Sequence, residues 1–397
     1  MASMNVWSVS ADLMDNFAGN TSQHMLVNST EPSGVTARDD VTTQHDVTSR
    51  DRLIPDGLML YVTLYLSIVI PIVISAFGTV TNVINLVIFS KMGVKDSMTV
   101  GLWALSLSDL LVTVQTLGSS VCYLANITTP SKFMNPILIQ YVSLCWSQDL
   151  MYLVSNWITT FISLERCYCV INPFKVRATF TRNRSIAAVV FIYAYHIGSY
   201  LPIFATHKLD WASEDASNFS NSSTVMVVSY GANRATIHHA VDILNGAVLP
   251  VIQQALVIGS AVCLSYGLKS SSKVRKHKQG DDVKRRSMLS QKESRLVTVV
   301  VFLAIILTVC NTPRFVAVYA TLLIPEMYIG RLYENVYVFL WALTALFASL
   351  NASVNICVYL LVNLSFRSRF KQLMCPTSST KTMSRDSDSP GISAIYK

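Results

Sequence analysis

Long apolar stretches, separated by short polar segments, set the hydrophobic pattern of this chain. Seven of them are long enough to cross a bilayer as a helix, which takes roughly 20 mostly apolar residues. They run over about Leu58–Phe89, Met98–Ala125, Pro136–Ile171, Ser185–Ala205, Ala240–Leu268, Leu296–Leu323 and Tyr333–Leu361. A helix in lipid satisfies its own backbone hydrogen bonds, so the pattern predicts an all-α seven-transmembrane helix bundle.

The segments outside this bundle predict two polar tails. Residues 1–57 are rich in Ser, Thr, Asn and Asp and predict a disordered tail without a cleavable signal peptide. Residues 58–362 form the membrane domain. Residues 363–397 begin with apolar side chains at helical spacing, which predicts a short amphipathic eighth helix on the membrane surface, followed by a Ser/Thr-rich tail.

Composition and charge fix the orientation that we expect. Only 14% of the residues are charged, against about 25% in soluble proteins. The net charge of +8 is unevenly placed: 22 Lys and Arg lie in the loops after the first, third and fifth stretches and in the C-terminal tail, and 7 lie on the other side. Positive charge collects in the cytoplasm, so we expect a multi-pass plasma-membrane protein with its N-terminus extracellular and its C-terminus cytoplasmic. The basic residues follow topology and do not indicate nucleic-acid binding.

Glycosylation motifs agree with that orientation. Five Asn-x-Ser/Thr acceptors fall on the expected outer side and predict a glycoprotein. They are Asn20, Asn28, Asn126, Asn218 and Asn221.

Polar residues inside the apolar stretches are costly and therefore candidate functional groups. The first two stretches contain Asn82 and Asp109, the third ends in Glu165-Arg166-Cys167, the fifth contains Pro250 and the sixth contains Asn311 and Pro313. In the seventh, Asn351, Asn355 and Tyr359 recur every fourth residue and so share one helix face.

Taken in order, these motifs resemble the rhodopsin-like (class A) G-protein-coupled receptors over about residues 58–375. Glu165-Arg166-Cys167 is similar to the Asp-Arg-Tyr triplet of that family, and Asn355-Ile-Cys-Val-Tyr359 to its Asn-Pro-x-x-Tyr motif. The residues within these motifs also resemble those of invertebrate peptide-type and molluscan chemosensory receptors. The resemblance implies a non-enzymatic cell-surface receptor that activates a heterotrimeric G protein, with a receptor kinase and arrestin as further partners.

The resemblance also implies an activation switch. Arg166 would pair with Glu165 and with Glu293, which lies 20 residues before Pro313, or about 30 Å along a helix. Release of this pair, with Pro313 and Tyr359 taking part, would open the cytoplasmic face to the G protein. The alternative is two interfacial charges that snorkel to water.

A sodium site is the second implied feature. Asp109 would bind the ion with oxygens from Asn82, Ser155, Asn351 and Asn355, and we expect Asn311 to join the same network. The alternative is a satisfied polar network that holds the helices together.

Charged residues in the outer halves of three stretches predict a ligand pocket. Asp149, Asp242 and Arg314 would form it with Gln148 and Trp341, and His238, His239 and Tyr337 would frame its mouth. Opposite charges suit a small polar or zwitterionic ligand or a peptide end. The alternative is an internal Arg314–Asp pair that only ties helices together.

Cysteines add two expectations. The loop over about 206–239 contains no cysteine, and Tyr141 stands at the usual helix-three partner position, so the disulfide of the family cannot form. Cys122 and Cys145 lie near the outer face, where they form either a substitute disulfide or two free thiols. Cys375 is a palmitoylation candidate at the end of the amphipathic helix.

Three alternatives to a chemosensory receptor differ in the sequence features that they predict. A receptor for a peptide hormone or neuropeptide fits the same motifs. A membrane transporter would predict inverted repeats and several midplane charges, and an enzyme would need a metal motif or a nucleophile elbow. The sequence has neither set of features.

Overall fold

A bundle of seven helical rods makes up most of the protein in the computed structural model. The residues that the structure describes are 53–129, 134–172, 179–214, 223–231, 233–275, 282–329 and 331–374. In chain order the rods are α2 (Asp56–Val62), η1 (Thr63–Val69) and α3 (Ile70–Met92); α4 (Ser97–Thr128); α5 (Pro136–Ile139), η2 (Gln140–Cys145) and α6 (Trp146–Ile171); α8 (Arg182–Thr206); α9 (Arg234–Val241), η3 (Asp242–Val248) and α10 (Leu249–Arg275); α11 (Asp282–Leu323); and α12 (Glu334–Val362). The η segments are π-helical turns. The predicted seven-helix bundle is confirmed.

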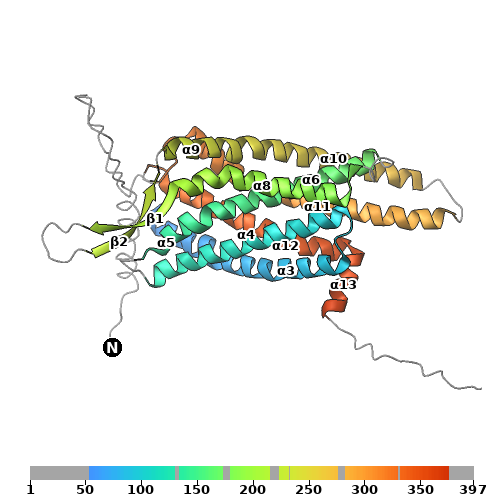
Figure 1. The fold of residues 1–397 in the computed structure, drawn as a ribbon, viewed down its shortest axis with the longest axis horizontal. Coiled ribbons are helices and arrows are strands. Elements are labelled where there is room, and N and C mark those ends of the chain that lie inside the picture. The colour runs from blue at the N-terminus through green and yellow to red at the C-terminus, as the bar shows by residue number, and fades with distance from the viewer. Residues whose placement is uncertain are drawn as a thin grey trace, which may run out of the picture.

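The rods run side by side along the long axis of the molecule (Figure 1). Six are long and apolar enough to cross a membrane by length and composition, and Pro136–Ile171 is the exception. Its long helix α6 contacts α4, α8, α10 and α11, so helices rather than lipid surround it and it tolerates more polar residues. The rods extend beyond the predicted stretches mainly at the polar ends of α10 and α11, because a helix does not stop where its apolar part ends.

Beside a buried apolar core, many polar side chains point inward and many apolar ones point outward, as expected for a protein in lipid. On α4, Ser108, Asp109 and Thr113 are fully buried. On α3, Val73 and Val80 are exposed. This surface would be unfavourable in water and suits the hydrocarbon core of a bilayer.

Small residues bring α3 and α12 into close contact. A Cβ atom on Gly78 would overlap the side chains of Ser353 on α12 and Thr113 on α4. At this approach the Ser353 hydroxyl donates to the Ile74 carbonyl over 3.1 Å, and the Asn82 amide donates to the Ala352 carbonyl over 2.8 Å. Membrane helices commonly associate through such small residues and interhelical hydrogen bonds.

A β-hairpin lies at one end of the bundle, which we call the hairpin end (Figure 1). Strands β1 (His207–Glu214) and β2 (Ser223–Tyr230) pair antiparallel, with His207 opposite Tyr230. The Gly231 amide donates to the Thr206 carbonyl over 2.9 Å and closes the base of the hairpin. The sequence analysis did not predict these strands, although the Val-rich run in β2 is typical of strand composition.

The short helix α13 (Leu364–Met374) lies at the opposite end, the α13 end. Phe366 is fully buried, and its ring centroid lies 5.4 Å from those of both Phe89 and Tyr359. Arg367 donates to the Leu360 carbonyl over 2.8 Å at the end of α12. A helix therefore occupies the position where an amphipathic one was predicted, and its placement on a membrane surface stays a prediction.

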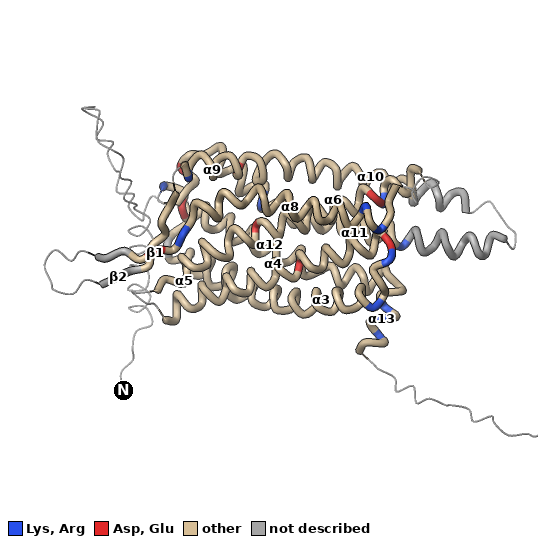
Figure 2. Tube along the Cα trace, viewed as in Figure 1, with Lys and Arg blue, Asp and Glu red and all other residues tan. Residues whose placement is uncertain are grey.

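The described Lys and Arg residues concentrate toward the α13 end (Figure 2). Leu53, the first described residue, is near the hairpin end, since the Asn335 amide there donates to the neighbouring Ile54 carbonyl over 2.8 Å. Met374, the last one, ends α13. The two limits of the described chain thus lie at opposite ends of the bundle, as an odd number of spans requires.

Candidate functional site

A buried carboxylate stands at the centre of the bundle. Asp109 on α4 is fully buried and accepts hydrogen bonds from the Ser155 hydroxyl on α6 over 2.5 Å and from the Asn355 amide on α12 over 2.7 Å. Both donors are neutral, and neither ion pair found in the described part of the chain includes Asp109. A buried charge without a counter-charge is costly. Asp109 is therefore suited to binding a cation or a proton.

The other residues predicted for this site lie on α3 and α12, two helices that pack against α4. Asn82 is fully buried, and its side-chain oxygen accepts from the Asn85 amide over 3.3 Å. Asn351 is buried one helical turn before Asn355. The neighbourhood offers carboxylate, hydroxyl and amide oxygens, which hard cations prefer. Within the described residues no group of three His, Cys, Asp or Glu could hold a metal ion, so a single carboxylate fits a monovalent cation better than a divalent one.

Asn311 belongs to a different network, and our expectation that it joins Asp109 is wrong for the described contacts. Its side-chain oxygen accepts from the Tyr152 hydroxyl over 2.6 Å and from the Asn156 amide over 3.2 Å. Its amide donates to Gln254 over 3.2 Å, and Gln254 donates to Thr308 over 2.7 Å. This second network joins α6, α10 and α11. Ser155 and Asn156 are adjacent on α6 but point about 100° apart, which separates the two networks.

The charged triplet lies near the α13 end of α6. Arg166 donates to Glu165 over 2.6 Å, and Glu165 is buried. Glu293 lies in α11, and its side chain is outside the described residues, so the second half of the predicted lock is untested. Tyr359 is fully buried against Phe89, and Pro313 lies inside the continuous helix α11, further toward the hairpin end.

In the hairpin half of the bundle, Arg314 and Asp149 form a bidentate ion pair. Both terminal nitrogens of Arg314 donate to the Asp149 carboxylate, one of them over 3.1 Å, and the Tyr200 hydroxyl donates to the same carboxylate. The side chain of Arg314 is 5% exposed. The pair ties α11 to α6 and, through Tyr200, to α8. This geometry matches the internal Arg314–Asp pair that the sequence analysis held as the alternative.

The remaining residues predicted for the pocket do not take part in this ion pair. Asp242 begins η3 and is exposed, and among the described residues it makes no ion pair. Gln148 and Trp341 are half-buried. The ring of Trp341 packs beside Tyr337, with centroids 6.2 Å apart. The structure therefore brings Asp149 and Arg314 together and leaves Asp242 outside the pair.

Several buried polar atoms in this half have no hydrogen-bond partner in the described part of the chain. They include both side-chain polar atoms of Asn245, Nε of Arg314, and the indole nitrogens of Trp146 and Trp341. Each such atom costs about 1–3 kcal/mol. Unpaired groups of this kind need an explanation, and a ligand that hydrogen-bonds to them is one. Asn245 and Trp146 were not among the predicted site residues, because neither carries charge nor belongs to a motif.

A family model for the 7 transmembrane receptor (rhodopsin family) matches residues 81–359, from the segment that holds Asn82 to Tyr359. The chain belongs to this family. It is thus a multi-pass membrane receptor that couples to G proteins. No match was found among curated proteins.

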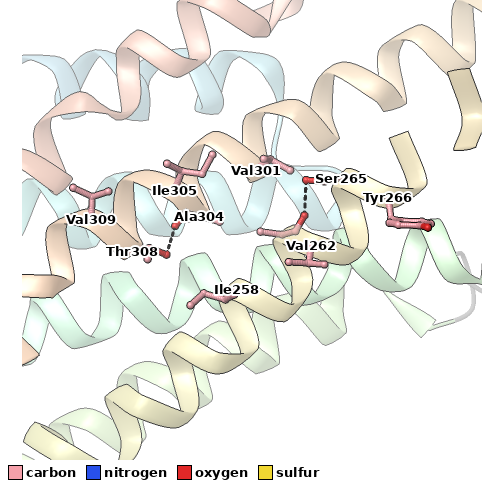
Figure 3. Close-up of a pocket in the computed structure, with 10 residues that line it drawn as sticks. Ile258, Val262, Ser265, Tyr266, Val301, Ala304, Ile305, Thr308 and Val309 are labelled. Carbon is pink, nitrogen blue, oxygen red and sulfur yellow. Dashed lines mark hydrogen bonds between the residues drawn. The ribbon is translucent and has the colours of Figure 1, made fainter. Parts of the chain in front are cut away.

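The receptor also has an apolar groove of about 510 Å³ between α10 and α11 (Figure 3). The hydroxyls of Ser265 and Thr308 in its lining donate to carbonyls of their own helices over 2.7 and 2.8 Å. Val262 and Tyr266 are largely exposed. With its polar groups satisfied and its apolar residues facing outward, this groove faces lipid, and it contains none of the predicted site residues.

Other predicted sites of the receptor fall partly outside the described residues. Cys122 and Cys145 are free thiols, which is the second of the two alternatives for that pair. Asn126 lies half-buried in the last turn of α4. The other glycosylation acceptors and the palmitoylation candidate lie outside the described residues, namely Asn20, Asn28, Asn218, Asn221 and Cys375.

Proposed function

We propose that the receptor binds a small polar ligand or a peptide end in the hairpin half of its bundle and activates a G protein at the α13 end. The observation that carries this proposal is the buried Arg314–Asp149 pair, together with the unpaired polar atoms of Asn245 and Arg314. A carboxylate and a guanidinium can each exchange their partner for an oppositely charged group of a ligand. A zwitterion could engage both.

The direction of signalling follows from charge. The Lys and Arg residues concentrate toward the α13 end (Figure 2), which supports a cytoplasmic location for that end and an extracellular location for the hairpin. The ligand would then enter from outside and the G protein would bind inside.

A path between the two sites runs through α11 and α6. Arg314 follows Pro313 on α11, and the Asn311 network lies on the same helix. A ligand that competes for Arg314 loosens the link between α11 and α6 and lets α11 move. At the α13 end, Arg166 and Glu165 on α6 would be released with Glu293, and Tyr359 would repack, which opens the face for the G protein.

We also propose that a sodium ion binds at Asp109. Ser155, Asn82, Asn351 and Asn355 supply oxygens from the neighbouring helices α6, α3 and α12. A bound cation would neutralise the buried carboxylate and stabilise the resting arrangement of α4, α6 and α12.

The ligand class has two candidates. A small polar compound, as for a chemosensory receptor, fits a charge pair that lies between helices. A neuropeptide or peptide hormone is favoured by the exposed Trp211 on β1, which could hold the body of a peptide while its end reaches Arg314. Receptor kinase and arrestin acting on the C-terminal tail remain further proposed partners.

A ligand screen in cells that express the receptor with a promiscuous G protein tests the proposal. Amino acids, small polar odorants and peptide libraries would be applied from outside. We expect a hit whose potency falls at least tenfold in Arg314→Lys at unchanged surface expression, since Lys keeps the charge but loses the bidentate geometry. An agonist equally potent on that variant would contradict a site at Arg314, and Arg166→Ala should abolish coupling without loss of binding.

A further inference from the structure

Two imidazole rings meet beneath the hairpin, outside the polar clusters described above. His207 is the first residue of β1 and is buried, and His238 lies on α9 and is half-buried. Their Nε2 atoms are 3.0 Å apart, and their ring centroids are 4.7 Å apart. The two residues are 31 positions apart in the chain, so the fold of the hairpin brings them together.

The contacts of His207 indicate which of its two ring nitrogens carries the proton. Its Nδ1 lies 2.9 Å from the Ile203 carbonyl, which can only accept, so Nδ1 carries the proton. In the neutral ring Nε2 then carries no proton, and it lies 3.0 Å from Nε2 of His238. Histidines that bind metals usually donate their second ring N–H to a carbonyl or carboxylate in this way.

Aromatic side chains hold the two rings in place and offer a third ligand. Trp146 packs edge-on against His238, with centroids 4.9 Å apart, and Tyr230 against His207 at 5.3 Å. The Tyr141 hydroxyl lies 3.4 Å from Nε2 of His207.

Two nitrogens on a tetrahedral zinc ion are roughly 3.3 Å apart, given bonds of about 2.0–2.1 Å. The observed nitrogens need to separate by only a few tenths of an ångström.

We propose that His207 and His238, with Tyr141 or water completing the coordination, form a binding site for a divalent zinc-like cation. The bound metal would tie β1 to α9, which continues through η3 into α10. Arg234 stacks on Tyr230, with its guanidinium carbon 3.5 Å from the ring centroid, and its charge opposes a nearby dication. The site is therefore weaker than a four-ligand structural zinc site, and suited to reversible regulation by a metal in the medium. That regulatory role rests on the outward orientation in the proposed function, whereas the site itself does not.

Isothermal titration of zinc chloride into the purified receptor in lipid nanodiscs tests the site directly. We expect the double variant His207→Gln/His238→Gln to bind one equivalent fewer than the wild type, and each single variant to lose affinity at least tenfold. His239→Gln is the matched control, because it removes an exposed imidazole next to His238 and should bind zinc like the wild type. Arg234→Gln should tighten binding several-fold by removing the opposing charge.

Cobalt chloride supplies a second readout. Cobalt in a site with nitrogen ligands absorbs visible light, and the wild type and His239→Gln should share a band that the double variant lacks. Equal zinc stoichiometry in the wild type and the double variant, with no difference in cobalt absorption, would overturn the proposal. Zinc binding that is lost in the double variant, together with signalling in intact cells that does not respond to external zinc, would leave the site standing and contradict its regulatory role.

Discussion

Removing Arg314 and removing Asp149 should destabilise the receptor to different extents. In Arg314→Ala, Asp149 loses its counter-charge but keeps the hydrogen bond from Tyr200, and its side chain is 22% exposed, so water can partly solvate it. In Asp149→Ala, a guanidinium with only 5% of its side chain exposed is left without a partner. Removing one partner of a buried pair costs about 3–5 kcal/mol. We expect Arg314→Ala to lower the free energy of unfolding by an amount at or below the lower end of that range. We expect Asp149→Ala to lower it by an amount near the upper end.

The double variant Arg314→Leu/Asp149→Leu decides whether the pair is structural. Replacing a buried ion pair with apolar groups is often neutral, so the double variant should unfold at a higher temperature than either single variant. Thermal unfolding of the purified receptor, with surface expression as a check on folding in cells, measures both effects. If the double variant loses as much stability as the two single variants together, the two residues act independently, and the loss of a buried partner is not the cause of the instability. If all three variants fold like the wild type, the pair contributes no stability at all.

Further predictions concern the centre of the bundle. Asp109→Asn should remove the rise in unfolding temperature that sodium chloride gives the wild type over choline chloride; an equal rise in both proteins would exclude sodium at that carboxylate. Gly78→Leu should abolish surface expression, because its side chain would overlap α4 and α12, whereas Gly198→Ala should be tolerated, since no atom lies within 4 Å of a Cβ there. Asn311→Leu should lower the free energy of unfolding by about 1–3 kcal/mol by leaving polar groups of its network unpaired, and an unchanged chemical denaturation midpoint would contradict that.

The sequence determined the number of rods, their order and their approximate ends. The lipid environment is the reason, because a segment of about 20 apolar residues can form all its backbone hydrogen bonds in a bilayer only as a helix. The family resemblance also implied that Asp109, Ser155 and Asn355 meet, and they do. The hairpin was missed, because its short strands lie between the apolar stretches and carry no pattern as strong as a span.

Only the tertiary structure decided which polar groups become partners. Asp149 rather than Asp242 pairs with Arg314, and Asn311 joins Gln254 rather than Asp109. Neighbouring positions on a helix point about 100° apart, so the partner depends on the rotation and depth of each rod. Those are set by close contacts between rods, such as the one at Gly78. A single sequence shows which groups lie inside the membrane, and the packing of the rods decides which of them touch.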